Sequence, residues 1–311
     1  MVVCIGESLI DFVPRDGGGE AALPGYQPVA GGCPYNCAVA VSRLGSDVSF
    51  AGAISSDFFG DFIAARLEAN GVGLSLVHRV DRPTTLAFVK KAADGSARYA
   101  FYTNDAADRA LSRELLPDLP DGAILQMGSI SIIADTEGDA ILHLAERERG
   151  RRVIAFDPNI RESLVEDERD YRERIERALG SATLLKTSDE DLAWIYPDTP
   201  VEEAVAAVLD AGVALVVVTR GAEGSTACTA TSRVAVAARA VEVRDTIGAG
   251  DSFLAALLVW LDERHATPQA VASLREEEIR EALEFASKVA AITCTRVGAD
   301  PPARDEVRRF R

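Results

Sequence analysis

Short apolar segments alternate with longer segments of helical periodicity along most of this chain. The apolar segments are predicted to be strands, at residues 2–11, 48–54, 123–127, 153–157, 184–187 and 215–219. Several are apolar throughout, which is typical of parallel strands covered on both faces. The periodic segments are predicted to be helices, at residues 34–44, 57–70, 137–149, 167–179 and 201–211. This alternation predicts an α/β fold in which helices cover both faces of a mostly parallel sheet.

Glycines mark the ends of these predicted helices. Each helix is followed directly by a glycine, namely Gly45, Gly71, Gly150, Gly180 and Gly212. A glycine at this position is expected to end the helix in the left-handed conformation. No repeat, low-complexity tract or linker-like run divides the sequence, so residues 1–311 are expected to form one domain.

Two segments break the alternation. Residues 84–91 and 97–103 are both β-like, and the loop between them contains Gly95, which predicts a hairpin. Residues 13–28 are rich in Gly and Pro and are expected to form a loop or a short edge strand. Together, approximately residues 12–30 and 83–103 are expected to form a small sheet that acts as a lid and excludes water during a reaction, unless they are two surface excursions without a role.

The charge of the chain excludes two classes of partner. It carries 33 basic and 49 acidic side chains, a formal net charge of −16 at pH 7. Such a surface repels nucleic acid and anionic membranes, and no apolar stretch reaches the roughly 18 residues that span a bilayer. The first residues show neither the basic segment nor the cleavage site of a signal peptide, so we expect a cytoplasmic protein.

The five cysteines are scattered, and we expect all of them to be reduced thiols. Only Cys33 and Cys37 are close in sequence, and no histidine lies near them with the spacing of a metal ligand. Two thiolates are too few for a zinc site. The spacing of Cys and His therefore excludes metal binding through thiolates.

A glycine-rich turn between a β-rich run and an apolar helix is the most informative motif. The run ends at Arg244, and the helix begins near Asp251. Backbone N–H groups of Gly248, Ala249 and Gly250 would point at an anion from the start of the helix. The turn matches neither a Walker A loop nor a dinucleotide fingerprint. Asp251 would then remove a proton from the hydroxyl that accepts a phosphoryl group, unless it only caps the helix.

These residues carry a resemblance to a known family. The sequence DTIGAGDSF at residues 245–253 resembles the C-terminal signature of the ribokinase-like (PfkB-type) carbohydrate kinases. The sequence GGCPYNCAVA at residues 31–40 is similar to the N-terminal signature, and residues 6–12, 157–161 and 218–225 are similar to further blocks. The resemblance implies a three-layer α/β/α sandwich with a small β-sheet lid. It also implies a kinase that uses ATP and Mg²⁺.

The resemblance assigns roles to individual residues. Asp251 matches the catalytic base, and Gly248, Ala249 and Gly250 match the anion hole for the γ-phosphate. The positions matched to sugar binding are Asp11, Gly32, Asn36, Phe101, Asn159 and Arg161. The positions matched to nucleotide binding are Lys186, Thr219, Gly221, Gly224, Thr246, Gly248, Gly250 and Ser287. Glu190 matches a carboxylate that holds Mg²⁺ through water, and Asp245 and Ile247 match a site for a monovalent cation, K⁺.

Within the family, residues 6–14, 83–88 and 99–109 look most like bacterial fructokinases, which phosphorylate D-fructose to fructose 6-phosphate. A 2-keto-3-deoxygluconate kinase is the alternative, but its acidic substrate would favour an arginine after Phe101 and Tyr102. Other ribokinase-family sugar or nucleoside kinases come next. A non-catalytic sugar-binding relative would not need Asp251, and a Rossmann dehydrogenase would need a glycine fingerprint near the N-terminus. The expected partners are a small sugar, ATP and a second copy of the chain bound through the lid.

Overall fold

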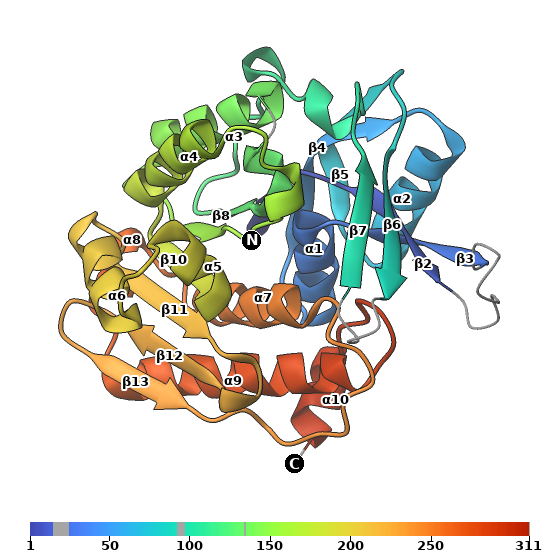
Figure 1. Ribbon diagram of the computed structural model, residues 1–311. Helices are drawn as coiled ribbons and strands as arrows, with labels where there is room; N and C mark the ends of the chain where they lie inside the picture. Colours follow the sequence, from blue (N-terminus) through green and yellow to red (C-terminus); the bar gives the residue numbers. More distant parts are fainter. Residues whose placement is uncertain (15–24, 92–96, 134, 311) are drawn as a thin grey trace.

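The computed structural model describes residues 1–14, 25–91, 97–133 and 135–310. Nine strands form a large sheet (Figure 1). In spatial order they are β13 (Arg233–Val236), β12 (Ser225–Cys228), β11 (Leu215–Thr219), β10 (Leu184–Ser188), β9 (Ile154–Asp157), β8 (Ile124–Gly128), β1 (Val2–Ile5), β4 (Val48–Ser55) and β5 (Gly73–Val80). The pairs from β11 through β5 are parallel, while β12 and β13 are antiparallel. The predicted mostly parallel sheet is confirmed.

Helices cover both faces of this sheet, as predicted. One face packs against α1 (Cys33–Arg43), α2 (Phe58–Ala69), α7 (Ala249–Asp262), α8 (Pro268–Ala272), α9 (Glu276–Cys294) and α10 (Arg304–Arg309). The other face packs against α3 (Asp135–Glu148), α4 (Glu168–Ser181), α5 (Asp189–Ile195) and α6 (Val201–Asp210). Side chains of β1 alternate between the two cores, because neighbouring strand residues point to opposite faces. Within the described ranges, no helix is long and apolar enough to cross a membrane.

A second, four-stranded sheet lies beside α1 and α2 (Figure 1). Its order is β3 (Tyr26–Gly31), β2 (Leu9–Pro14), β6 (Thr85–Lys91) and β7 (Ala97–Tyr102). β6 and β7 pair antiparallel, which confirms the predicted hairpin, and β3 is an edge strand that begins within the expected segment 13–28 and extends beyond it. The tip of the hairpin, with Gly95, and residues 15–24 lie outside the described residues.

The first predicted strand is wrong in one respect. Residues 2–11 form two strands in two different sheets, β1 and β2, rather than one. Gly6 separates them with φ +138, and a Cβ there would lie 2.2 Å from the hydroxyl oxygen of Ser131. Only glycine combines this conformation with so close an approach. Asp11 therefore belongs to the small sheet and does not end a strand of the large one.

The predicted strand before Arg244 is also absent. Residues 241–244 have no strand assignment, and the N–H groups of Arg244 and Asp245 donate to the carbonyl of Cys294 at 2.8 and 3.3 Å. The backbone here is thus bound to the end of α9, which leaves it no partner strand. The alternating apolar pattern at residues 241–244 is too short to distinguish a strand in a sheet from an extended segment bound to a helix end.

Five helices were predicted to end at a glycine in the left-handed conformation, and four of these predictions are confirmed. Gly45, Gly71, Gly150 and Gly212 have φ between +72 and +103. Gly180 lies inside α4, which continues to Ser181. Ala182 follows in an extended conformation and leads directly toward β10, so no left-handed residue is required there.

The two faces of the small sheet have different surroundings. On one face, Phe12 stacks on Phe88 with ring centroids 4.5 Å apart, and Phe12 also contacts Phe59 of α2 at 5.8 Å. On the other face, Asp11 pairs in register with Ala87, which pairs with Phe101. Because register partners share a face, the aromatic packing directs Asp11 and Phe101 away from α2.

We predict that Gly128→Ala strongly destabilises the protein. A Cβ at Gly128, which has φ +143, would lie 1.9 Å from the backbone oxygen of Asp157. The neighbouring strand would have to move, so we expect a loss of more than about 3 kcal/mol in the free energy of unfolding, measured by urea denaturation. Gly150→Ala is the matched control. Gly150 also has positive φ but faces open space, and its substitution should cost about 1 kcal/mol. Equal losses for the two variants would contradict the steric argument.

Candidate active site

Several parallel strands end together at one edge of the large sheet. β9, β10 and β11 are neighbours and end at Asp157, Ser188 and Thr219. The strand order reverses between β1 and β8, because the chain proceeds outward to β4 on one side and to β9 on the other. Open parallel sheets bind ligands at this edge, where the order reverses. A ligand site is therefore expected at the carboxyl edge of the large sheet, near β1 and β8.

The buried carboxyl group of Glu7 joins three segments there. One oxygen accepts a hydrogen bond from the N–H of Cys33 at 3.0 Å, and the Ser131 hydroxyl donates to the other. The Ser131 oxygen in turn accepts from the N–H of Glu7 at 2.8 Å. Burial raises the pKa of Glu7 to about 7, against the opposing effect of these hydrogen bonds. No role was expected for Glu7 from its sequence position, although it lies in the block at residues 6–12.

Two predicted site residues, Asn36 and Asp251, are in direct contact. They lie in the first turns of α1 and α7, and the Asn36 amide donates to Oδ2 of Asp251 at 2.8 Å. Gly32 precedes α1 with φ +109, and a Cβ there would lie 2.8 Å from the carbonyl oxygen of Glu7. The beginnings of the two helices, each the positive end of a helix dipole, therefore meet at one carboxylate.

The glycine-rich turn before α7 has the conformation that an anion site requires. Gly248 has φ +74, and a Cβ there would lie 2.6 Å from the Cβ of Ala299. A Cβ at Gly250 would lie 3.0 Å from the Nζ of Lys186, so this ammonium group faces the turn. The N–H of Ala249 donates to the carbonyl of Thr246 at 3.2 Å, which means that a bound anion would share it. The turn before α7 thus combines backbone dipoles with the positive charge of Lys186, and both favour a bound anion although the protein surface is acidic.

Lys186 forms a buried ion pair with Asp157. Its Nζ lies 2.9 Å from Oδ2 of Asp157, and both side chains are inaccessible to solvent or nearly so. Burial alone lowers the pKa of Lys186, but Asp157 raises it above its usual value. The lysine therefore stays charged beside the glycine turn.

Asp11 lies close to two other predicted site residues. Its carboxyl group is against the backbone of Gly31, where a Cβ would lie 2.3 Å from Oδ2 of Asp11. Burial raises the pKa of Asp11 to about 7, the positive charge of Arg161 lowers it, and the negative charge of Asp251 raises it. Asp11, Arg161 and Asp251 thus interact through space. Phe101 lies on the same face of the small sheet.

The segment after β9 carries Asn159 and Arg161. Asn159 has φ +37, and the guanidinium group of Arg161 donates to the carbonyls of Asn159 and Ile160 at 3.2 and 3.1 Å. These bonds fold the segment back on itself at the carboxyl edge. From this segment, the positive charge of Arg161 lowers the pKa of Asp11.

The residues matched to nucleotide binding lie along the same edge and beyond it. Thr219 ends β11, and the turn after it is closed by a hydrogen bond from the N–H of Arg220 to the carbonyl of Gly224 at 2.8 Å. Gly221 and Gly224 have φ +47 and +104. Thr246 is exposed before α7, and Ser287 is buried in α9. In the described part of the chain, these residues are outside the hydrogen-bond network around Asp251.

The positions matched to metal ions fit oxygen ligation. Glu190 is exposed in the first turn of α5, and Mg²⁺ keeps much of its water, so an accessible carboxylate suits a water-mediated contact. Asp245 accepts hydrogen bonds from the N–H groups of Ile247 at 3.1 Å and Gly298 at 2.9 Å. Asp245 thus ties two loops together, and each of its oxygens keeps a lone pair for a cation.

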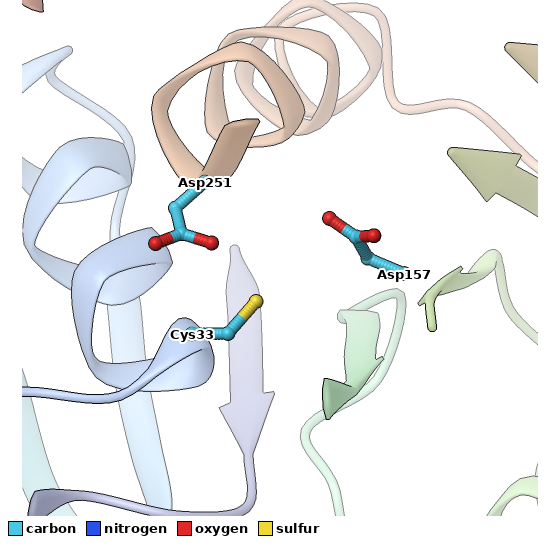
Figure 2. A group of neighbouring side chains, drawn as sticks. All are labelled: Cys33, Asp157 and Asp251. Atoms are coloured by element: carbon cyan, nitrogen blue, oxygen red, sulfur yellow. The ribbon is translucent and has the colours of Figure 1, made fainter. Parts of the chain in front are cut away.

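Cys33 lies inside the site although the sequence analysis gave its side chain no role. Figure 2 shows the side chains of Cys33, Asp157 and Asp251 pointing toward one another. Burial raises the pKa of the Cys33 thiol, which hydrogen-bonds to Asp251. Cys33 and Asp157 stood in two of the quoted sequence blocks, but only the fold shows that they meet.

Comparisons with known proteins agree with this geometry. The sequence model of the pfkB family carbohydrate kinases matches residues 1–306. A fructokinase of Rhizobium leguminosarum bv. trifolii is 40% identical over 282 residues, which cover 90% of this chain and 86% of that protein. The crystal structure of a Xylella fastidiosa fructokinase with bound ATP superposes with a TM-score of 0.91, at 29% identity, and covers 99% of this chain and 97% of that one. A fructokinase of Vibrio cholerae O395, bound to fructose, ADP and calcium, superposes with a TM-score of 0.86 at 27% identity, covering 99% and 98%.

The burial of Glu7 predicts a dependence of stability on pH. Its folded pKa is about 7, above the ordinary value of 4.5, so the folded state retains a proton that the unfolded state has already lost. The stabilisation is full below pH 4.5 and is lost as the pH rises to about 7. The test is to measure the free energy of unfolding of wild type and Glu7→Gln by urea denaturation at several pH values. Between about pH 5 and about pH 8, the wild type should lose about 2 to 3 kcal/mol more than the variant does.

The matched control for this titration is Glu284→Gln, which removes one carboxylate from the exposed side of α9. The stability difference between wild type and this variant should stay nearly constant over the same pH range. If Glu7→Gln instead follows the wild type at every pH, Glu7 does not titrate as its burial implies.

Proposed function

The chain belongs to the pfkB family of carbohydrate kinases, and from this premise we propose that it transfers the γ-phosphate of ATP to D-fructose, forming fructose 6-phosphate. The related proteins named above support this proposal: all three are named fructokinases, one has bound ATP, and another has bound fructose and ADP. The likeness extends over nearly the whole chain. We propose that the whole chain acts as one kinase domain.

The contact between Asn36 and Asp251 carries the proposal. The amide of Asn36 donates a hydrogen bond to Oδ2 of Asp251 at 2.8 Å, and this bond fixes the orientation of the carboxylate. The other oxygen can then accept a proton from a hydroxyl group. A carboxylate held in this way, directly after a glycine-rich turn that can bind an anion, is placed between an acceptor hydroxyl and a phosphate.

In the proposed reaction, Asp251 takes the proton of the C6 hydroxyl as that oxygen bonds to the γ-phosphorus and the bond to ADP breaks. Backbone N–H groups of Gly248, Ala249 and Gly250 hold the negative charge of the transferring group. Lys186 faces Gly250 and adds a fixed positive charge. These donors act in a partly buried environment, where electrostatic stabilisation is stronger than in water.

Fructose is a neutral polyol and needs hydrogen-bonding groups at fixed positions. We propose that Asp11, Asn36 and Arg161 bind its hydroxyls, with Gly32, Asn159 and Phe101 shaping the pocket. The charge of Arg161 already acts on Asp11, which lies on the small sheet. A neutral substrate therefore suits this site better than an acidic sugar, which would compete with Asp11 for the arginine.

The nucleotide is proposed to lie along the edge next to β10 and β11. Thr219, Gly221, Gly224, Thr246 and Ser287 would contact ATP. Glu190 would hold Mg²⁺ through water, and bound Mg²⁺ supplies charge neutralisation at the phosphates. Asp245 and Ile247 would hold K⁺, which adds positive charge beside the turn before α7.

We propose that the small sheet is a lid and that two copies of the chain associate through it in the cytoplasm. Two aromatic side chains at this surface are exposed to solvent. They are Tyr102 of β7, which is 64% exposed, and Phe58 of the neighbouring α2, which is 73% exposed. Both belong to the row of ring contacts that runs through Phe12 and Phe88. Exposed apolar groups in one row are typical of an interaction surface.

Initial rates with ATP and Mg²⁺ across a panel of acceptors test the substrate. The panel is fructose, 2-keto-3-deoxygluconate, ribose, tagatose and adenosine. We expect kcat/KM for fructose to exceed that of every other acceptor by at least about tenfold, because unpaired polar groups in the site penalise a wrong substrate. A higher value for 2-keto-3-deoxygluconate would contradict the assignment of fructose, and no turnover of any acceptor would contradict the kinase.

The role of Asp251 is tested by Asp251→Asn. The variant should bind fructose and ATP within several-fold of wild type, because the amide oxygen can still accept the hydrogen bond from Asn36. Its turnover should fall by roughly 10² or more, the usual contribution of a general base. Asp210→Asn, at the exposed last residue of α6, is the control and should leave turnover unchanged. Near-normal turnover of Asp251→Asn would show that Asp251 only caps α7.

A further inference from the structure

We propose that Cys33, Asp157 and Asp251 form a binding site for a thiophilic divalent cation of the Zn²⁺ or Cd²⁺ type, which inhibits the enzyme when bound. One sulfur and two carboxylate oxygens lie within 4.8 Å of one another. They come from three separate elements, the start of α1, the end of β9 and the first turn of α7 (Figure 2). The three residues are 4%, 0% and 8% exposed.

An unsatisfied oxygen provides independent support for a ligand at this position. Oδ1 of Asp157 is buried and has no hydrogen-bond partner among the described residues, while Oδ2 binds Lys186. A buried carboxylate oxygen without a partner is costly and calls for an explanation. A cation between Cys33 and Asp251 would supply that partner.

The donor set selects the class of cation. Mg²⁺ and Ca²⁺ prefer oxygen ligands, whereas a thiolate favours Zn²⁺ and other soft cations. Zn²⁺ binds sulfur at about 2.3 Å and carboxylate oxygen at about 2.1 Å, so tetrahedral binding requires the donors to lie about 3.5 Å apart, and side-chain rotation has to close any gap up to the 4.8 Å within which they lie. Three protein ligands leave a fourth tetrahedral position for water.

Charge balance also favours a divalent cation. Binding requires the Cys33 thiol to lose its proton, which leaves one thiolate and two carboxylates. The ammonium group of Lys186 and a divalent cation together neutralise these three negative charges. A buried cluster is far less costly when its charges cancel.

The proposed site departs from the expectation drawn from the spacing of Cys and His, which excluded metal binding through thiolates. That expectation considered Cys37 and the histidines as partners of Cys33. The actual partners are two aspartates, more than 100 residues away in sequence, which only the fold brings to the thiol.

The site goes beyond the proposed sugar kinase and can be tested without sugar or nucleotide. Co²⁺ is the probe, because thiolate ligation gives it a near-ultraviolet charge-transfer band. Titration of the nucleotide-free protein should give this band at one Co²⁺ per chain, and Zn²⁺ should abolish it. Cys33→Ala and Asp157→Asn should each lose the band.

Cys228→Ala is the matched control, because it removes a half-buried thiol outside the cluster and should keep the band. Cys33→Ser, which preserves the size of the side chain, is the second variant in case Cys33→Ala fails to fold, and it should lose the band too. A band that persists without Cys33, or Co²⁺ binding without a thiolate band, would overturn the site.

Inhibition provides the second readout. With ATP and Mg²⁺ in excess, Zn²⁺ should inhibit sugar phosphorylation because it occupies the Asp251 oxygen that accepts the proton. Cys33→Ala should weaken this inhibition by at least about tenfold, and Cys228→Ala should not change it. Equal inhibition of wild type and Cys33→Ala would overturn the proposal while leaving the kinase assignment intact.

Discussion

The arrangement of the site depends on one buried carboxyl group, that of Glu7. It accepts hydrogen bonds from the N–H of Cys33, at 3.0 Å, and from the hydroxyl of Ser131. These contacts join the end of β1, the start of α1 and the turn after β8, where the strand order of the large sheet reverses. Since Asn36 and Cys33 lie in the first turn of α1, their positions relative to Asp251 follow from this junction.

The proposed anion site on this acidic molecule depends on local groups. Its net charge is −16, so long-range attraction cannot bring a nucleotide to the surface. The glycine turn before α7 exposes backbone dipoles, and Lys186 faces it while paired with Asp157. Near Lys186, the thiol of Cys33 lies beside the carboxylates of Asp157 and Asp251, and these three groups form the cluster that we propose binds a soft cation.

The small sheet contributes through the opposite character of its two faces. Aromatic rings on one face pack against α2, and Asp11 and Phe101 lie on the other face. This arrangement requires the chain to leave the large sheet after four residues of β1, which Gly6 permits. A sheet built in this way can hold a polar group, Asp11, on one face with the support of an apolar cluster on the other.

The sequence by itself determined the α/β class, most helix ends, the hairpin and the family, because apolar periodicity, glycine positions and contiguous motifs are local properties. It also singled out Asp251, Asn36 and Lys186 as candidate site residues, which the fold brings to one place. The break at Gly6, the absence of a strand at residues 241–244 and the continuation of α4 past Gly180 were decided by tertiary contacts, which local propensity does not encode. Only the tertiary structure placed Glu7, Cys33 and Asp157 in the site, because it joins segments that lie far apart in sequence.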